Sequence, residues 1–199
     1  MARPAVYDED TRAALLEAAA RRLAEGGAEA VTMRALAREV GATTSAIYAL
    51  FGSKEGLLAA VYREAFAGLA LELARVPVGD DPLRELFELG LAYRRSARAR
   101  PALYLVMFGR DPVAAPPSEE DEALAAGTLG RLSSAVARAQ AAGALPGDDP
   151  LPLTLQLWGV VHGLASLELL GALGDDTAAD VTWEQALRAI VRGHQHPGA

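Results

Sequence analysis

Cysteine is absent from the 199 residues of this chain. Its absence excludes a disulfide framework, thiolate metal sites and cysteine nucleophiles, and it is compatible with a reducing compartment. The first dozen residues also lack an apolar run of the length that a secretory signal needs. We therefore expect a cytoplasmic protein. Its 51% hydrophobic content is ample for a buried core.

Basic charge is scarce. Lysine and arginine together number 19 against 26 acidic residues, the net charge is −7, and Lys54 is the only lysine. A nucleic-acid partner normally needs a basic surface, yet residues 1–60 carry seven basic and eight acidic groups, about −1 in total. Any DNA binding must therefore depend on a few placed contacts, and we do not expect a broad basic face.

Catalytic signatures are also missing. The three histidines have no metal-ligand spacing, and the chain has no glycine-rich phosphate loop or serine elbow, so we expect no enzyme, no metal and no cofactor. The apolar residues 151–174 are nearly long enough for a membrane span, but Gln156, His162 and Glu168 interrupt them and no Lys or Arg flanks them. This pattern indicates a helix buried between protein surfaces.

Residues 32–51 combine helical apolar spacing, a turn and a small polar surface. Thr32 is a good N-cap for a helix that Gly41 ends, and Thr43 can cap a second helix in which Ile47 and Phe51 lie four residues apart. Two short helices joined by a glycine-containing turn are the pattern of a DNA-reading helix-turn-helix. In this register Ser45, Ala46 and Ala49 face away from the apolar stripe.

The remaining chain continues in helices, with no convincing strand and no repeat. A first helix should span residues 10–23 and end at a glycine pair, and a fourth should begin at Ser53 and run past Leu73. Further helices are expected at 83–99, 102–109, 122–142, 151–174 and 182–193, with a loop at 111–121. The predicted fold is all-α, with about nine helices.

Residues 10–62 resemble the TetR family of bacterial transcriptional repressors. The resemblance lies on Thr32, Leu36-Ala37, Gly41, Ile47-Tyr48, Phe51 and Ser53-Lys54-Glu55. The run from Trp158 to His162-Gly163 is similar to the signature of a subgroup whose ligand domain is named for its Trp-His-Gly motif. The resemblance implies a helix-turn-helix DNA-binding domain at 1–55 and a helical-bundle ligand-binding and dimerisation domain at 56–199. It also implies a homodimer released from a pseudo-palindromic operator by a small molecule.

The resemblance assigns roles within the helix-turn-helix. Thr32, Thr43, Tyr48 and Lys54 match positions that hold phosphates, whereas Thr44, Ser45 and Ala46 match positions that face bases. Leu50 departs from the family, which often has a polar or aromatic residue there. Because little is left for hydrogen-bonded readout, we expect thymine-methyl contacts and DNA shape to carry specificity, with Arg34 or Arg3 as helpers.

Aromatic and methionine side chains suggest an apolar effector pocket, although each of them is also compatible with an ordinary core position. The candidates are Phe87, Tyr93, Tyr104, Met107, Phe108, Trp158 and His162. Trp158 and His162 are one turn apart and should share a helix face. The last two helices could form a self-complementary dimer face. An arginine cluster at 94–100 forms a solvated face or pairs with acidic loops.

Two functions remain open from the residues. The first is a ligand-responsive, sequence-specific DNA-binding regulator, a repressor released by a small apolar effector. The alternative is a helical small-molecule-binding or interaction protein without DNA binding, which the nearly neutral charge of residues 1–60 would suit.

Overall fold

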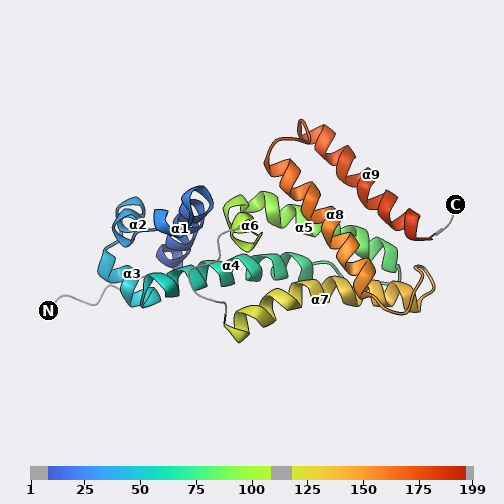
Figure 1. Cartoon of the computed structure of the whole chain (residues 1–199), viewed down its shortest axis with the longest axis horizontal. Coiled ribbons are helices and arrows are strands. Elements are labelled where there is room, and N and C mark those ends of the chain that lie inside the picture. Colours follow the sequence, from blue (N-terminus) through green and yellow to red (C-terminus); the bar gives the residue numbers. More distant parts are fainter. Residues whose placement is uncertain (1–8, 109–117, 196–199) are drawn as a thin grey trace. The chain divides into compact units, whose positions relative to one another are not determined.

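The computed structural model describes residues 9–108 and 118–195, and these ranges contain nine α-helices and no strand (Figure 1). The predicted all-α class is confirmed. The helices are α1 (Glu9–Ala30), α2 (Met33–Val40), α3 (Thr44–Phe51), α4 (Lys54–Ala74), α5 (Pro82–Ala99), α6 (Pro101–Phe108), α7 (Glu119–Ala141), α8 (Leu151–Leu169) and α9 (Asp176–Gln195). Most of the predicted loop at 111–121 lies outside the described residues. Within them, no helix is both long and apolar enough to cross a bilayer.

The end of α8 and the start of α9 differ from the expected boundaries. Helix α8 ends at Leu169, five residues before the predicted end, and Gly171 and Gly174 turn the chain with φ of 70° and 82°. Helix α9 then starts at Asp176, six residues earlier than predicted, because the Asp175 carboxylate accepts a hydrogen bond from the amide of Ala178 at 2.9 Å. In α1, the glycine pair breaks the helix as expected, with φ of 66° at Gly27, but helical turns resume after it.

The chain packs as two compact units. Unit 1 consists of the described parts of Met1–Ala67 and Arg100–Ala123, and unit 2 of the described parts of Gly68–Ala99 and Leu124–Ala199. Helix α6 thus belongs with α1, against which it packs, although it is distant from α1 in the sequence. The functional boundary expected at residue 55 remains a prediction, since the packing changes units further along α4.

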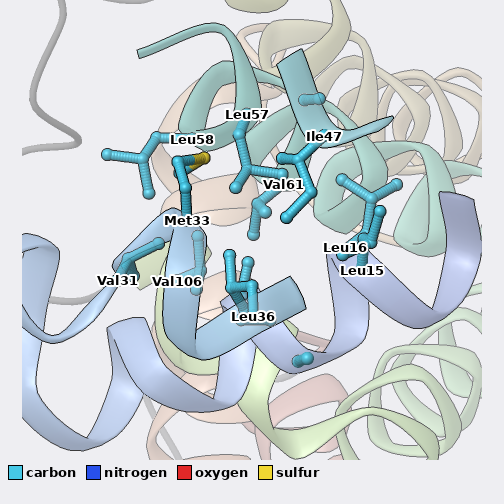
Figure 2. Packing of buried hydrophobic residues seen from close by; sticks show 14 of the residues in the cluster. Leu15, Leu16, Val31, Met33, Leu36, Ile47, Leu57, Leu58, Val61 and Val106 are labelled. Carbon is cyan, nitrogen blue, oxygen red and sulfur yellow. The ribbon is translucent and has the colours of Figure 1, made fainter. Parts of the chain in front are cut away.

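The core of unit 1 holds the helix-turn-helix in place. Leu15 and Leu16 from α1, Leu36 from α2 and Ile47 from α3 are each at most 1% exposed. Figure 2 shows these side chains converging with Leu57, Leu58 and Val61 of α4 and Val106 of α6. Burial of such apolar surface is the main term that stabilises a small helical unit, so α2 and α3 depend on their neighbours for a fixed orientation.

Unit 2 is held by close packing of α5 against α8 and α9. Gly90 of α5 lies so near Leu187 of α9 that a Cβ at residue 90 would come within 2.7 Å of a Leu187 methyl carbon. Trp183 of α9 is fully buried. These contacts fix α9 along the surface of α5.

Gly56 allows α4 to begin directly after α3. A Cβ at this position would lie 2.1 Å from the carbonyl oxygen of Phe51, which is backbone and cannot move aside. We predict that Gly56→Ala destabilises the protein by about 1–3 kcal/mol in chemical denaturation, as overpacking does. Gly127→Ala is the matched control, because Gly127 lies in α7 with open space around it, and there alanine should stabilise by about 0.5–1 kcal/mol. Equal effects of the two substitutions would contradict this account.

Candidate nucleic-acid interface

Helices α2 and α3 are each defined by a threonine cap and joined by a glycine turn. The Thr32 hydroxyl oxygen accepts a hydrogen bond from the Ala35 amide at 3.3 Å, and the Thr43 oxygen accepts one from the Ala46 amide at 3.1 Å. Gly41 ends α2 with φ of 71°, a left-handed conformation that favours glycine. The helix-turn-helix predicted from residues 32–51 is therefore present with its predicted caps.

Helix α3 has one buried face and one exposed face. Ile47 is fully buried, whereas Ser45 and Ala49 are exposed and the Tyr48 side chain is 51% exposed. Tyrosine is a large side chain to leave in solvent on a helix of eight residues. An exposed aromatic ring with a hydroxyl on such a helix can reach a phosphate oxygen.

The prediction for Ala46 is not supported by the structure. Ala46 was expected to face bases, but it is only 1% exposed and lies on the buried side of α3 with Ile47. The reason is the register of the helix, in which residues 46 and 47 both turn toward the core. Ala49, one turn after Ser45, lies on the exposed side.

The start of α4 lies directly after α3. Gly52 ends α3 with φ of 75°, and its amide donates to the Tyr48 carbonyl at 2.8 Å. The Ser53 hydroxyl accepts from the Gly56 amide at 3.0 Å, so this serine caps α4 as predicted. Lys54 is the first residue of α4 and is partly exposed. A cation here opposes the helix dipole, so an anionic partner would favour it.

The charges around α2 divide into paired and exposed groups. Arg21 and Arg22 of α1 both donate to Glu39 of α2, with closest nitrogen-to-oxygen distances of 2.9 and 2.7 Å. These hydrogen bonds, from Arg22 foremost, hold the pKa of Glu39 below its ordinary value. Arg34 and Arg38 are exposed, and within the described residues no carboxylate lies within 4 Å of either. These two arginines therefore leave positive charge exposed on α2.

Three of the predicted pocket residues come together in unit 2. The hydroxyl of Tyr93 on α5 lies 3.2 Å from Nδ1 of His162 on α8. The rings of Trp158 and His162 lie 5.6 Å apart, so the two residues share a helix face as expected. Burial lowers the pKa of His162, which favours a neutral imidazole. The arrangement is a small polar pair beside a large aromatic surface.

Of the other four predicted pocket residues, Phe87 lines a different part of unit 2, and Tyr104, Met107 and Phe108 belong to unit 1. Phe87 of α5 lines a groove of about 420 Å³ between α5 and α9, where the guanidinium of Arg188 lies 5.5 Å from its ring centre. Tyr104 and Phe108 belong to unit 1, where their rings pack 5.3 Å apart and Met107 covers the core. The sequence identified these side chains by type and could not assign them to a unit.

The arginine cluster is not a uniform solvated face. Arg94 is 8% exposed and pairs with Glu168 and Asp180, whereas Arg98 pairs with Glu168 and with Asp176, the first residue of α9. The expected pairing with acidic segments therefore holds in part. Within the described ranges, no three His, Asp or Glu side chains form a group that could hold a metal ion.

An exposed apolar stripe on α8 was missed at the sequence level. Leu151, Leu155 and Leu167 are each 45–51% exposed, and Gly159 and Gly163 lie between them with open space where a Cβ would be. Their regular spacing of four residues was the available signal. This spacing does not stand out in the sequence because α8 is apolar on nearly every side.

Comparison with known proteins agrees with this arrangement. Residues 15–61 match the family model described as bacterial regulatory proteins, tetR family, and residues 86–190 match the model of the tetracyclin repressor-like, C-terminal domain. The HTH-type transcriptional regulator Rv1816 of Mycobacterium tuberculosis is 26% identical over 92% of this chain and 92% of its own.

Solved structures share the fold. A protein of unknown function from Rhodococcus sp. RHA1 is 25% identical and superposes with a TM-score of 0.78 over 98% of this chain and all of its own. AibR, solved in complex with isovaleryl coenzyme A and operator DNA, is 21% identical, with a TM-score of 0.71 over 88% of this chain and 97% of its own. Because the carboxyl-terminal model alone matches more than half of the residues, the chain belongs to the TetR family of ligand-responsive, DNA-binding transcriptional repressors.

Proposed function

We propose that this regulator reads DNA with the exposed side of α3. The observation that carries the proposal is the division of α3 into a fully buried Ile47 side and an exposed side with Ser45, Tyr48 and Ala49. Short side chains let the helix backbone approach base edges, and the Ala49 methyl suits contact with a thymine methyl. Ser45 and Thr44 supply the hydroxyls on this surface.

Phosphate contacts would fix the register of α3 on the duplex. The exposed Thr32 can donate its hydroxyl proton to a phosphate while its oxygen caps α2, and Tyr48 can donate in the same way. The other residues proposed to contact phosphates are Thr43, Lys54 and Arg34. Because these cations are few, we expect the specificity to depend on DNA shape. Arg3, which was predicted together with Arg34 to assist binding, lies outside the described residues.

The proposed dimer interface is the exposed stripe of α8 together with α9. Two glycines within a helix weaken it, and their position between exposed leucines suits close approach of a second helix. Val181 of α9 is 48% exposed and Leu170 is 80% exposed, which extends the apolar surface. Pairing of this face with a second copy would put two α3 helices on one operator.

The proposed effector site is the Tyr93, Trp158 and His162 group. A largely apolar small molecule with one hydrogen-bonding group would suit the aromatic surface and the tyrosine–histidine pair. AibR, which shares the fold, was solved with isovaleryl coenzyme A, an apolar acyl group on an anionic carrier; this supports a small-molecule effector for the present chain but not an anionic one. Thermal-shift screening in which only strongly anionic compounds stabilise the protein would count against this site.

Titration of the purified protein with DNA tests the proposal. DNA from upstream of its own gene should bind more tightly than random duplex, and the affinity should fall as salt concentration rises. Equal binding of the two DNAs at low salt would favour the alternative, a helical small-molecule-binding or interaction protein. The proposed DNA binding would place the protein in the cytoplasm.

The contributions of Tyr48 and Lys54 to DNA binding can be distinguished by the salt dependence of the affinity in variants of each residue. Lys54→Gln should weaken binding to all DNA sequences and reduce the slope of log affinity against log salt by about 1, because one phosphate contact by a cation is lost. Tyr48→Phe should weaken binding with an unchanged slope, since the hydroxyl carries no charge. Arg75→Gln, at an exposed residue directly after α4 and in unit 2, serves as the charge control. A slope that stays the same in Lys54→Gln removes Lys54 from the interface.

A further inference from the structure

A charge network built on a nearly buried ion pair joins three helices of unit 2. The guanidinium of Arg94 on α5 donates to both carboxylate oxygens of Glu168 on α8, with closest distances of 2.6 and 2.9 Å. Its Nη1 donates to Asp180 on α9 at 2.6 Å, and the Asp180 side chain is 66% exposed. One arginine thus connects the last turn of α8 to the first turns of α9.

Trp183 encloses the same carboxylate from α9. Its indole N–H donates to Glu168 Oε2 at 2.7 Å, and the Arg94 guanidinium lies 5.5 Å from its ring centre. The side chains of Arg94 and Glu168 are each only 10% exposed. Burial opposes ionisation of Glu168, but the hydrogen bonds and charge of Arg94 outweigh it, so the pKa of Glu168 lies below its ordinary value.

Stability alone is a weak explanation for this network. Removing a buried ion pair in favour of packed apolar side chains is often neutral or stabilising, because desolvation of the charges offsets their attraction. Buried charges do, however, penalise any arrangement in which they lose their partners. A bidentate guanidinium tolerates little rotation of the groups that it joins, so the network favours one orientation of α9 on α8.

The two partners of Arg94 lie next to the exposed apolar face. Glu168 follows Leu167, which is 46% exposed, and Asp180 precedes Val181, which is 48% exposed. A shift of the helix backbone at either acid would therefore also move an exposed apolar residue of the proposed dimer interface. The network and that interface share the same two helices.

We propose that Arg94 and Glu168 are positioning residues for operator binding, which fix α8 against α9 so that two copies pair in one geometry. This inference rests on the dimer proposed above. The inference gives the network a role in the relative orientation of the two copies of the chain in the dimer, in addition to its role in holding unit 2 together.

A second buried network in unit 2 provides a matched control. Glu85 on α5 has a side chain 1% exposed and accepts from Arg131 and Arg138 of α7, each at 2.6 Å. It thus resembles Glu168 in burial and in having arginine partners, but its partners lie on α7 and not on α8 or α9. Glu85→Gln and Glu168→Gln should both lower the thermal midpoint.

The experiment compares these two variants of the full chain by sedimentation equilibrium and by binding to operators of varied half-site spacing. Glu168→Gln should raise the dimer dissociation constant about tenfold relative to Glu85→Gln and should flatten the spacing preference. Arg94→Lys, which keeps the charge but loses the bidentate geometry, should act like Glu168→Gln. It provides the same test if Glu168→Gln does not fold.

Equal dimer constants and spacing profiles in the Glu85 and Glu168 variants would overturn the inference. So would an Arg94→Lys protein that dimerises and selects spacing like the wild type. A wild-type protein that is monomeric and binds DNA would instead refute the proposed dimer itself, and the two failures are therefore distinguishable.

Discussion

Gly159→Glu is expected to leave the helical fold intact and to abolish dimerisation. Gly159 lies in the middle of the exposed stripe of α8, and beyond the backbone of its own helix no atom lies within 4 Å of the position that a Cβ would take, so the substituted side chain starts from open space. In a dimer, the carboxylate would be buried in an apolar interface without a partner, at a cost that the interface cannot offset. Operator affinity should then fall by at least about 100-fold, because two linked half-site contacts become one.

Gly127→Glu is the control for this prediction. Gly127 lies in α7, also with open space around its backbone, and carries the same change in charge and volume. It should remain dimeric and bind the operator like the wild type. Circular dichroism and sedimentation of both variants give the comparison, and a dimeric Gly159→Glu protein with full operator affinity would move the interface away from α8.

Ile47→Ala should give the largest loss of stability within the helix-turn-helix. Ile47 is fully buried among Leu36, Leu57 and Val61, and removing a buried aliphatic side chain of this size costs about 2–5 kcal/mol through lost burial and a residual cavity. The free energy of unfolding from chemical denaturation measures the loss. DNA binding should weaken only to the extent that the protein unfolds.

Substitution of Tyr48, which follows Ile47, should have the opposite effects on stability and on operator binding. Tyr48→Ala removes an exposed ring, so the free energy of unfolding should change by no more than about 0.5 kcal/mol, whereas operator binding should be severely weakened. The two adjacent substitutions thus separate the structural side of α3 from its reading side. Equal destabilisation by both, or normal operator binding by Tyr48→Ala, would refute the division of the helix.

The helix-turn-helix could be predicted because its determinants are local. The caps at Thr32 and Thr43 and the turn at Gly41 act within a few residues, so periodicity and residue type suffice to find them. Ala46 was misplaced because alanine is compatible with either face of a short helix. Tertiary packing, and not the sequence of α3, decides on which side residue 46 lies.

Features that depend on distant residues could not be predicted. Glu168 was recognised only as a polar interruption of an apolar helix, since its partner Arg94 is 74 residues away. Tyr104 and Phe108 were grouped with Trp158 by chemical type, although they pack in a different unit. Residue type suggests what a side chain can do, whereas its partner depends on the folded chain.

Selection of binding sites from randomised duplex DNA tests the central claim most directly, because it requires both a reading helix and a dimer. The wild-type protein should enrich an inverted repeat whose half-site centres lie about 34 Å apart, or modestly more. Tyr48→Ala should fail to enrich it, and Gly127→Glu should enrich it normally. Recovery of no motif by the wild type, or of the same motif by Tyr48→Ala, would contradict the account.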